Sequence, residues 1–145
     1  MNLIVILCKA GEKEMPTDRS HLNQLVIYQK SLDIFRLSRR IASYITYDKN
    51  ILEMQRSKKK EYRYASNIVL DSLGLAPKIA ETELQKNPTV KLKYAKSLSK
   101  FIDRIYSNSL KLEKTKAQGK DFLKLLRKEL IQLRELHMHY MNSLL

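Results

Sequence analysis

The chain has 145 residues, of which 43% are hydrophobic and 30% charged, with only three glycines and three prolines, so it predicts one all-α domain. Its 28 basic and 15 acidic residues give a formal net charge of +13, and a polyanionic partner would relieve the self-repulsion of this charge. A single cysteine, Cys8, excludes an intrachain disulfide and fits a reducing cytoplasm.

Residues 1–15 differ in composition from the rest of the chain. Residues 3–8 are six consecutive apolar residues, LIVILC, a run too short to span a membrane. They also lack the basic leader and the length of a secretory signal. We expect residues 1–15 to be a loose tail or a mis-called start, with Met15 as the true start. Residues 16–145 should form the single domain.

Residues 22–46 predict a long amphipathic helix, because they lack glycine and proline and repeat apolar residues at steps of three and four. The expected inner line is Leu25, Tyr28, Leu32, Phe35, Ala42 and Ile45. Ile27, Ile34 and Ile41 run beside this line, and a stripe of that width suits a bundle. The helix is expected to end at residues 48–50 or to extend towards Met54.

The second helix is expected over residues 61–85, after the most basic short window of the chain, RSKKKEYR at residues 56–63. Its expected inner line is Tyr64, Ile68, Ser72, Leu75 and Ile79. Pro77 removes a helical hydrogen bond three residues after Gly74. We therefore expect a kink near these two residues, or two shorter helices that meet there.

The third helix should begin with Asn87 as N-cap and Pro88 as first helical residue, and end near Glu113. After a loop broken by Gly119, Asp121 is expected to cap the fourth helix. The expected inner line of that helix is Leu123, Leu126, Leu130, Leu133, His137, Tyr140 and Leu144. Four helices joined by short loops predict an antiparallel up-down-up-down four-helix bundle.

The positive charge makes RNA or DNA the first candidate partner, an acidic protein the second and an anionic membrane the third. The candidate phosphate contacts lie on the outer faces of the third and fourth helices and in the lysine-rich turn before the second. They are Lys58, Lys59, Lys60, Lys96, Lys100, Arg104, Lys124, Arg127 and Lys128. No cofactor is expected, because no glycine-rich phosphate loop is present.

One enzymatic alternative uses Arg134 and His139, whose spacing matches the loose signature of the HEPN-type ribonucleases. In such an enzyme the arginine would hold phosphate and the histidine would move protons. Residues five apart lie about 140° apart around a regular helix, which disfavours this pairing. His137 and His139 also diverge, so no shared metal is expected. We expect His137 to lie in the core with a hydrogen-bond partner.

Three segments resemble a known bacterial family of four-helix-bundle proteins. LVIYQKSLDIF at residues 25–35 is similar to the family's opening helix, and APKIAE at residues 76–81 to a later proline-containing stretch. LQKNPTVKLKYAKSLSKFIDRIYSNSLKL at residues 84–112 is similar to its helix-turn-helix spacing. The family includes proteins encoded within rRNA intervening sequences and Avd, the accessory protein of diversity-generating retroelements. Thr82 departs from the first branch, and the Gly-Trp-type ending of Avd is missing.

This resemblance implies a cytoplasmic, non-enzymatic bundle that assembles as a homo-oligomer, typically a pentamer. The Avd branch further implies that the basic surface binds nucleic acid and a partner reverse transcriptase. The expected function is therefore that of an Avd-like accessory factor. The alternatives are an rRNA intervening-sequence protein and a HEPN-type ribonuclease toxin.

Overall fold

The structure is a computed structural model that describes residues 21–145, so the expectations for residues 1–15 lie outside it. The described residues contain no strand, and a helical turn at residues 21–24 precedes six longer helices. These helices are α3 (Val26–Thr46), α4 (Ile51–Arg56), α5 (Lys60–Leu73), α6 (Leu75–Leu84), α7 (Pro88–Glu113) and α8 (Lys120–Ser143). The all-α prediction is confirmed for this part of the chain.

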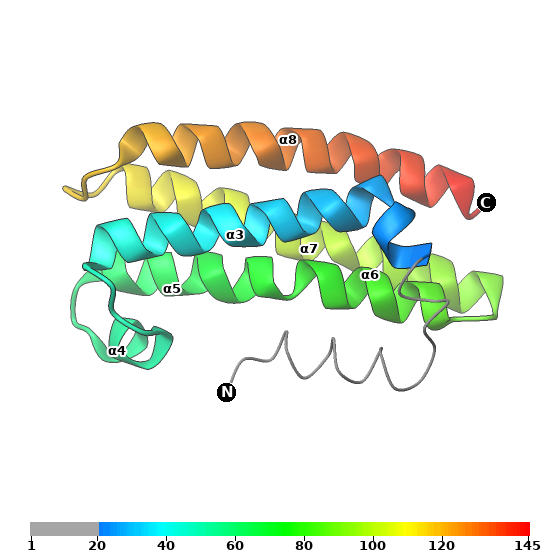
Figure 1. The fold of residues 1–145 in the computed structure, drawn as a ribbon, viewed down its shortest axis with the longest axis horizontal. Coiled ribbons are helices and arrows are strands. Elements are labelled where there is room, and N and C mark those ends of the chain that lie inside the picture. The colour runs from blue at the N-terminus through cyan, green and yellow to red at the C-terminus, as the bar shows by residue number, and fades with distance from the viewer. Residues whose placement is uncertain (1–20) are drawn as a thin grey trace.

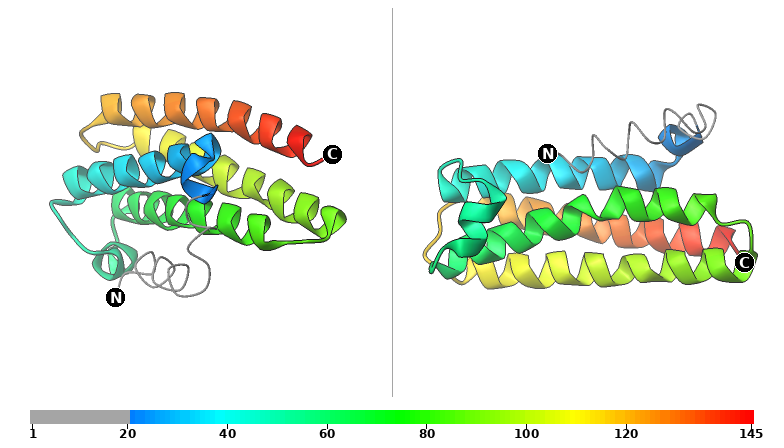
Figure 2. Two further views of the ribbon diagram at one scale, coloured as in Figure 1. Left: turned by 45° about the vertical axis from the view of Figure 1, so that its right-hand side comes forward. Right: turned by 90° about the horizontal axis from the view of Figure 1, so that it is seen from below.

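The long helices pack side by side along a common direction (Figures 1 and 2). α3 contacts α5, α6 and α8, and α7 contacts the same three helices from the other side. The α7–α8 loop, the end of α3 and the start of α5 lie at one end of the molecule in Figure 1, where α4 packs against α5. The α6–α7 turn and the C-terminus lie at the opposite end.

The buried side of α3 is centred on a different line from the predicted one. Its buried residues are Ile27, Ser31, Ile34, Ser38, Ile41, Ala42, Ile45 and Thr46. Leu25, Tyr28 and Phe35, which were expected at the centre, are only partly buried against the core. The reason is that Ser31 and Ser38 are fully buried, since small side chains allow neighbouring helices to come close.

Gly74 separates α5, which ends at Leu73, from α6, which begins at Leu75. A Cβ atom at Gly74 would lie 2.8 Å from Cε1 of Phe101 on α7, so only glycine fits there without displacing the ring. Pro77 lies in the first turn of α6, where a backbone N–H has no intrahelical partner to lose.

The N-cap of α7 was predicted correctly, whereas that of α8 was not. Asn87 caps α7 as expected, because its side-chain oxygen accepts from the N–H groups of Thr89 at 2.9 Å and Val90 at 3.2 Å. The prediction that Asp121 caps α8 is wrong. Gly119 is the N-cap with φ 92°, a backbone angle that favours glycine, and Asp121 lies in the first turn.

Candidate nucleic-acid interface

The predicted phosphate contacts are exposed, with Arg127 as the exception. Lys96 and Lys100 lie on the outward side of α7, and Lys124 and Lys128 on the outward side of α8, which packs beside it. Three more precede or begin α5, namely Lys58, Lys59 and Lys60. The structure therefore brings the α7 and α8 lysines onto neighbouring helices.

Two predicted contacts are arginines that already bind acidic residues. Arg104 Nη2 lies 3.0 Å from Asp71 Oδ1 on α5, and its guanidinium lies 4.9 Å from the centre of the Phe101 ring. Arg127 Nη2 lies 2.5 Å from Glu113 Oε2 on α7, with only 12% of its side chain exposed. Arg127 therefore ties α8 to α7 and has little charge left for a phosphate.

The excess positive charge lies at groups outside the ion pairs. Residues 1–20 contain three bases and three acids, so the whole +13 belongs to residues 21–145. Each Lys or Arg ion pair removes one charge of each sign and leaves this excess unchanged. It must therefore reside on the exposed cations that have no acidic partner within the described residues.

Six such lysines gather around the α7–α8 loop and form what we call the α7–α8 lysine cluster: Lys111, Lys114, Lys116, Lys120, Lys124 and Lys128. All six are exposed, and the salt bridges of the described residues include none of them. Glu113, the nearest acid in α7, is held by Arg127. The sequence prediction included only the last two, because the loop was treated as a connection.

An open pocket adjoins this cluster, and three separate segments line it: the end of α3, the start of α5 and the α7–α8 loop. We call it the tyrosine pocket, because its lining includes Tyr44, Tyr47 and Tyr62 together with Lys59 and Lys116. Its other lining residues are Ser43, Ile45, Asp48, Glu61, Ala117 and Gln118. This pocket could not be predicted from the sequence, because its segments are far apart in the chain.

The pocket combines exposed aromatic rings with ammonium groups. Tyr44 is 52% and Tyr47 is 80% exposed. The Tyr44 ring meets Phe122 of α8 edge-on, with ring centres 5.6 Å apart. Lys59 Nζ lies 5.0 Å from the centre of the Tyr62 ring, a distance at which the cation is attracted to the aromatic face.

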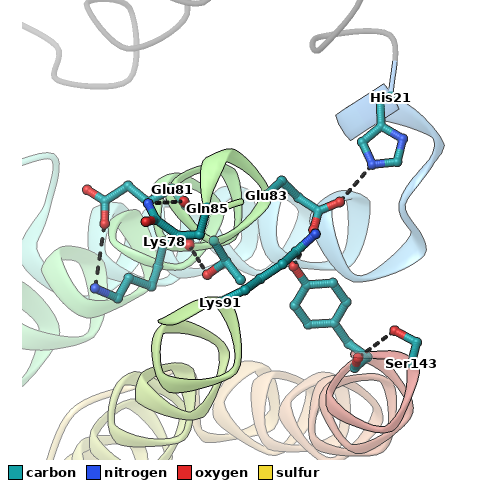
Figure 3. A network of polar contacts seen from close by, with 9 residues as sticks. His21, Lys78, Glu81, Glu83, Gln85, Lys91 and Ser143 are labelled. Atoms are coloured by element: carbon teal, nitrogen blue, oxygen red, sulfur yellow. Dashed lines mark hydrogen bonds and ion pairs between the residues drawn. The ribbon is translucent and has the colours of Figure 1, made fainter. Parts of the chain in front are cut away.

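A second polar cluster surrounds Glu83 (Figure 3), which has only 12% of its side chain exposed. His21 Nε2 lies 2.7 Å from Glu83 Oε1. The Tyr140 hydroxyl donates to Glu83 Oε2 at 2.7 Å, and Lys91 Nζ lies 3.2 Å from the same oxygen. This carboxylate therefore joins α6, α7, α8 and the turn that precedes α3.

The environment of Glu83 favours its charged form. Burial raises the pKa of this carboxyl group, but the hydrogen bonds from Tyr140, His21 and Lys91 outweigh burial and lower it overall. Burial and the neighbouring Glu83 carboxylate raise the pKa of Tyr140. Because these groups form hydrogen bonds with one another, the cluster stabilises the packing of the helices that it connects. The Glu83 carboxylate is therefore not a vacant proton acceptor.

Of the two residues of the ribonuclease alternative, Arg134 is paired with an acidic residue. Arg134 Nη2 lies 3.0 Å from Asp103 Oδ1, and its guanidinium lies 4.9 Å from the centre of the Tyr106 ring. His139 is exposed. His137 is buried with Nε2 2.7 Å from the carbonyl oxygen of Ala95, which confirms its predicted role in the core.

Two further features are absent from the part of the chain that the structure describes. Residues 21–145 contain no group of three or more His, Cys, Asp or Glu side chains arranged to hold a metal ion. Within the same residues, no helix has the length and apolar character needed to cross a membrane.

No family model, no curated protein and no solved structure matches this chain.

Proposed function

We propose that this chain is a non-enzymatic, cytoplasmic protein that binds the phosphates of RNA or DNA. It would be built as an antiparallel up-down-up-down four-helix bundle in which α5 and α6 together form the second member. The observation that carries the proposal is the α7–α8 lysine cluster, which is exposed and lacks acidic partners among the described residues. A polyanion would relieve its mutual repulsion.

Lysine is well suited to binding that does not depend on base sequence. Its ammonium group is a compact charge on a flexible stem, so it follows a phosphate backbone without fixed geometry. Each neutralised phosphate releases condensed counterions, which makes affinity fall steeply with salt. Lys58, Lys59 and Lys60 would extend the contact surface around the same end of the molecule.

We further propose that the protein acts as a homo-oligomer, a pentamer according to the family resemblance, and serves a reverse transcriptase as an Avd-like factor. Exposed apolar side chains on α8 support a subunit contact: Leu125 is 43%, Ile131 is 49% and Met138 is 61% exposed. A monomer by light scattering at micromolar concentration would contradict the assembly. A gene location inside an rRNA gene, with no neighbouring reverse transcriptase, would favour the intervening-sequence branch.

The central test compares two triple variants that remove equal charge. Lys100→Gln, Lys124→Gln and Lys128→Gln together should weaken binding to RNA or DNA. Losing up to three contacts should flatten the log–log salt slope by about 0.7 to 0.9 per contact. The matched control replaces Arg40, Arg63 and Lys86, exposed cations on α3, on α5 and in the α6–α7 turn, by glutamine. Arg104 is spared because it holds Asp71.

The outcomes separate the proposal from its alternatives. If both triple variants weaken binding equally, net charge alone controls binding, and the lysines of α7 and α8 have no special role. Absence of binding to RNA and DNA at low salt would redirect the search to an acidic protein partner. RNA cleavage that disappears when Arg134 or His139 is replaced would establish the ribonuclease alternative.

A further inference from the structure

The geometry points to a single-stranded ligand: we propose that the tyrosine pocket receives an unpaired base while the α7–α8 lysine cluster holds the flanking phosphates. This inference rests on the proposed function and specifies its substrate class. A base in a duplex is stacked between its neighbours and cannot enter such a pocket unless it is flipped out. The pocket would therefore favour single strands over duplexes.

Tyr47 is the first observation, because its position is unfavourable for the fold alone. It ends α3 with φ 54° and ψ 50°, in the left-handed region where glycine is the usual residue. A bulky side chain is strained there, and its burial could offset that strain. The ring is instead 80% exposed, so it gains little from packing. An exposed, strained tyrosine is better explained by a ligand that stacks on it.

The second observation is that rings and cations share one opening. Tyr44 and Tyr47 present exposed rings, and Lys59 and Lys116 line the same pocket. Aromatic rings beside a basic groove are the usual means by which proteins hold single strands, because every base has a face that stacks. The pocket adjoins the α7–α8 lysine cluster through Lys116, which belongs to both.

The third observation concerns the two carboxylates in the lining, Asp48 and Glu61. They would repel a phosphate inside the pocket, whereas they can accept hydrogen bonds from the amino groups of bases. The Ser43 hydroxyl donates to Asp48, while Glu61 has no hydrogen bond or ion pair within residues 21–145. The base should therefore enter and the phosphate stay outside, with cytosine, which has an amino group, favoured over thymine.

The test uses the full chain and fluorescence anisotropy with labelled oligo(dC) and oligo(dT) of about 16 nucleotides and a duplex of equal length. Tyr47→Gly removes the ring and suits the left-handed backbone, so a binding loss cannot come from unfolding. It should weaken oligo(dC) binding roughly tenfold and leave duplex binding unchanged. Since stacking involves no counterion release, the salt slope should also stay the same.

Two controls define the role of the ring. Tyr47→Phe keeps the aromatic face and should bind oligo(dC) like the wild type. Leu84→Ala removes an exposed apolar side chain at the opposite end of the molecule and should have no effect. If Tyr47→Gly binds oligo(dC) as tightly as the wild type, the pocket is not a base site, although lysine-dependent binding would stand. If the wild type binds none of the three DNA probes and no RNA of equal length at low salt, both the inference and the proposed function fail.

Discussion

At the scale of single residues, Glu83 is held by three side chains, those of His21, Lys91 and Tyr140. Replacing it with glutamine removes the charge that Lys91 and His21 face and weakens the acceptor of the Tyr140 hydroxyl. We expect Glu83→Gln to destabilise the fold by about 1–3 kcal/mol at pH 7, measured by urea unfolding. Glu81→Gln is the matched control on the same helix, because Glu81 is exposed and faces only Lys78 at 3.5 Å. An equal effect of both variants would contradict the stabilising role of the Glu83 cluster.

The same carboxylate predicts a pH dependence. Its pKa is lower in the folded protein than its ordinary value of 4.5, so it stabilises the fold above pH 4.5. That contribution is lost as the pH falls through the lowered value of the folded state. Between neutral pH and pH 3, the melting temperature of the wild type should therefore fall more than that of Glu83→Gln. Parallel curves would show that Glu83 titrates normally.

Ser38 and Ser66 carry buried hydroxyl groups that have no hydrogen-bond partner within the described residues. Alanine removes such a group without leaving a large cavity, and it also favours the helix. Each replacement by alanine should raise stability by about 0.5–1 kcal/mol. Ser31→Ala is the control, because the Ser31 hydroxyl donates to the carbonyl oxygen of Ile27 at 2.9 Å. The prediction fails if all three variants behave alike.

At the scale of elements, an alanine at the junction of α5 and α6 would have two opposite effects on stability. Alanine at a helical glycine usually stabilises a protein by about 0.4–1 kcal/mol. At Gly74, however, the new Cβ would lie 2.8 Å from the Phe101 ring, and overpacking costs about 1–3 kcal/mol. We expect Gly74→Ala to destabilise the fold, measured by thermal unfolding. The double variant with Phe101→Leu should recover part of the loss, and full stability of the single variant would contradict the contact.

The helices themselves could largely be predicted from the sequence, because their signals are local. Asn87 and Pro88 marked the start of α7, and the leucines of α8 predicted its buried side. The centre of the buried side of α3 was misplaced, because a pattern of apolar residues does not include Ser31 and Ser38, whose small side chains pack in the core. Residues 51–56, expected at most as a frayed extension of the first helix, form a separate helix, α4.

The candidate sites were harder to predict, because their parts come from distant segments. The tyrosine pocket joins residues 43–48, 59–62 and 116–118, and no periodic pattern links these three segments. The partners of Glu83 lie 8 to 62 residues away in the chain. Lys124 and Lys128 of the lysine cluster were predicted from their place on the outer face of the fourth helix, whereas the pairing of Arg104 and Arg127 with acids depended on the packing of the helices.

At the scale of the whole molecule, the net charge of +13 should make stability depend on salt. Raising sodium chloride from about 0.05 to 0.5 M screens the repulsion among the exposed cations. The melting temperature should therefore rise by a few degrees, measured by circular dichroism without nucleic acid. Affinity for nucleic acid should fall over the same range. A melting temperature that falls with salt would show that the ion pairs outweigh the repulsion.

The two ends of the molecule also differ in a way that has practical value. α8 runs from the α7–α8 loop to the C-terminus, a length of about 36 Å for 24 residues. Leu145 is 85% exposed. If the protein is immobilised on a sensor chip through its C-terminus, the tyrosine pocket will face the flowing solution. Coupling through Lys116 would place the same pocket against the chip, so the two orientations should give different capture capacities for one oligonucleotide.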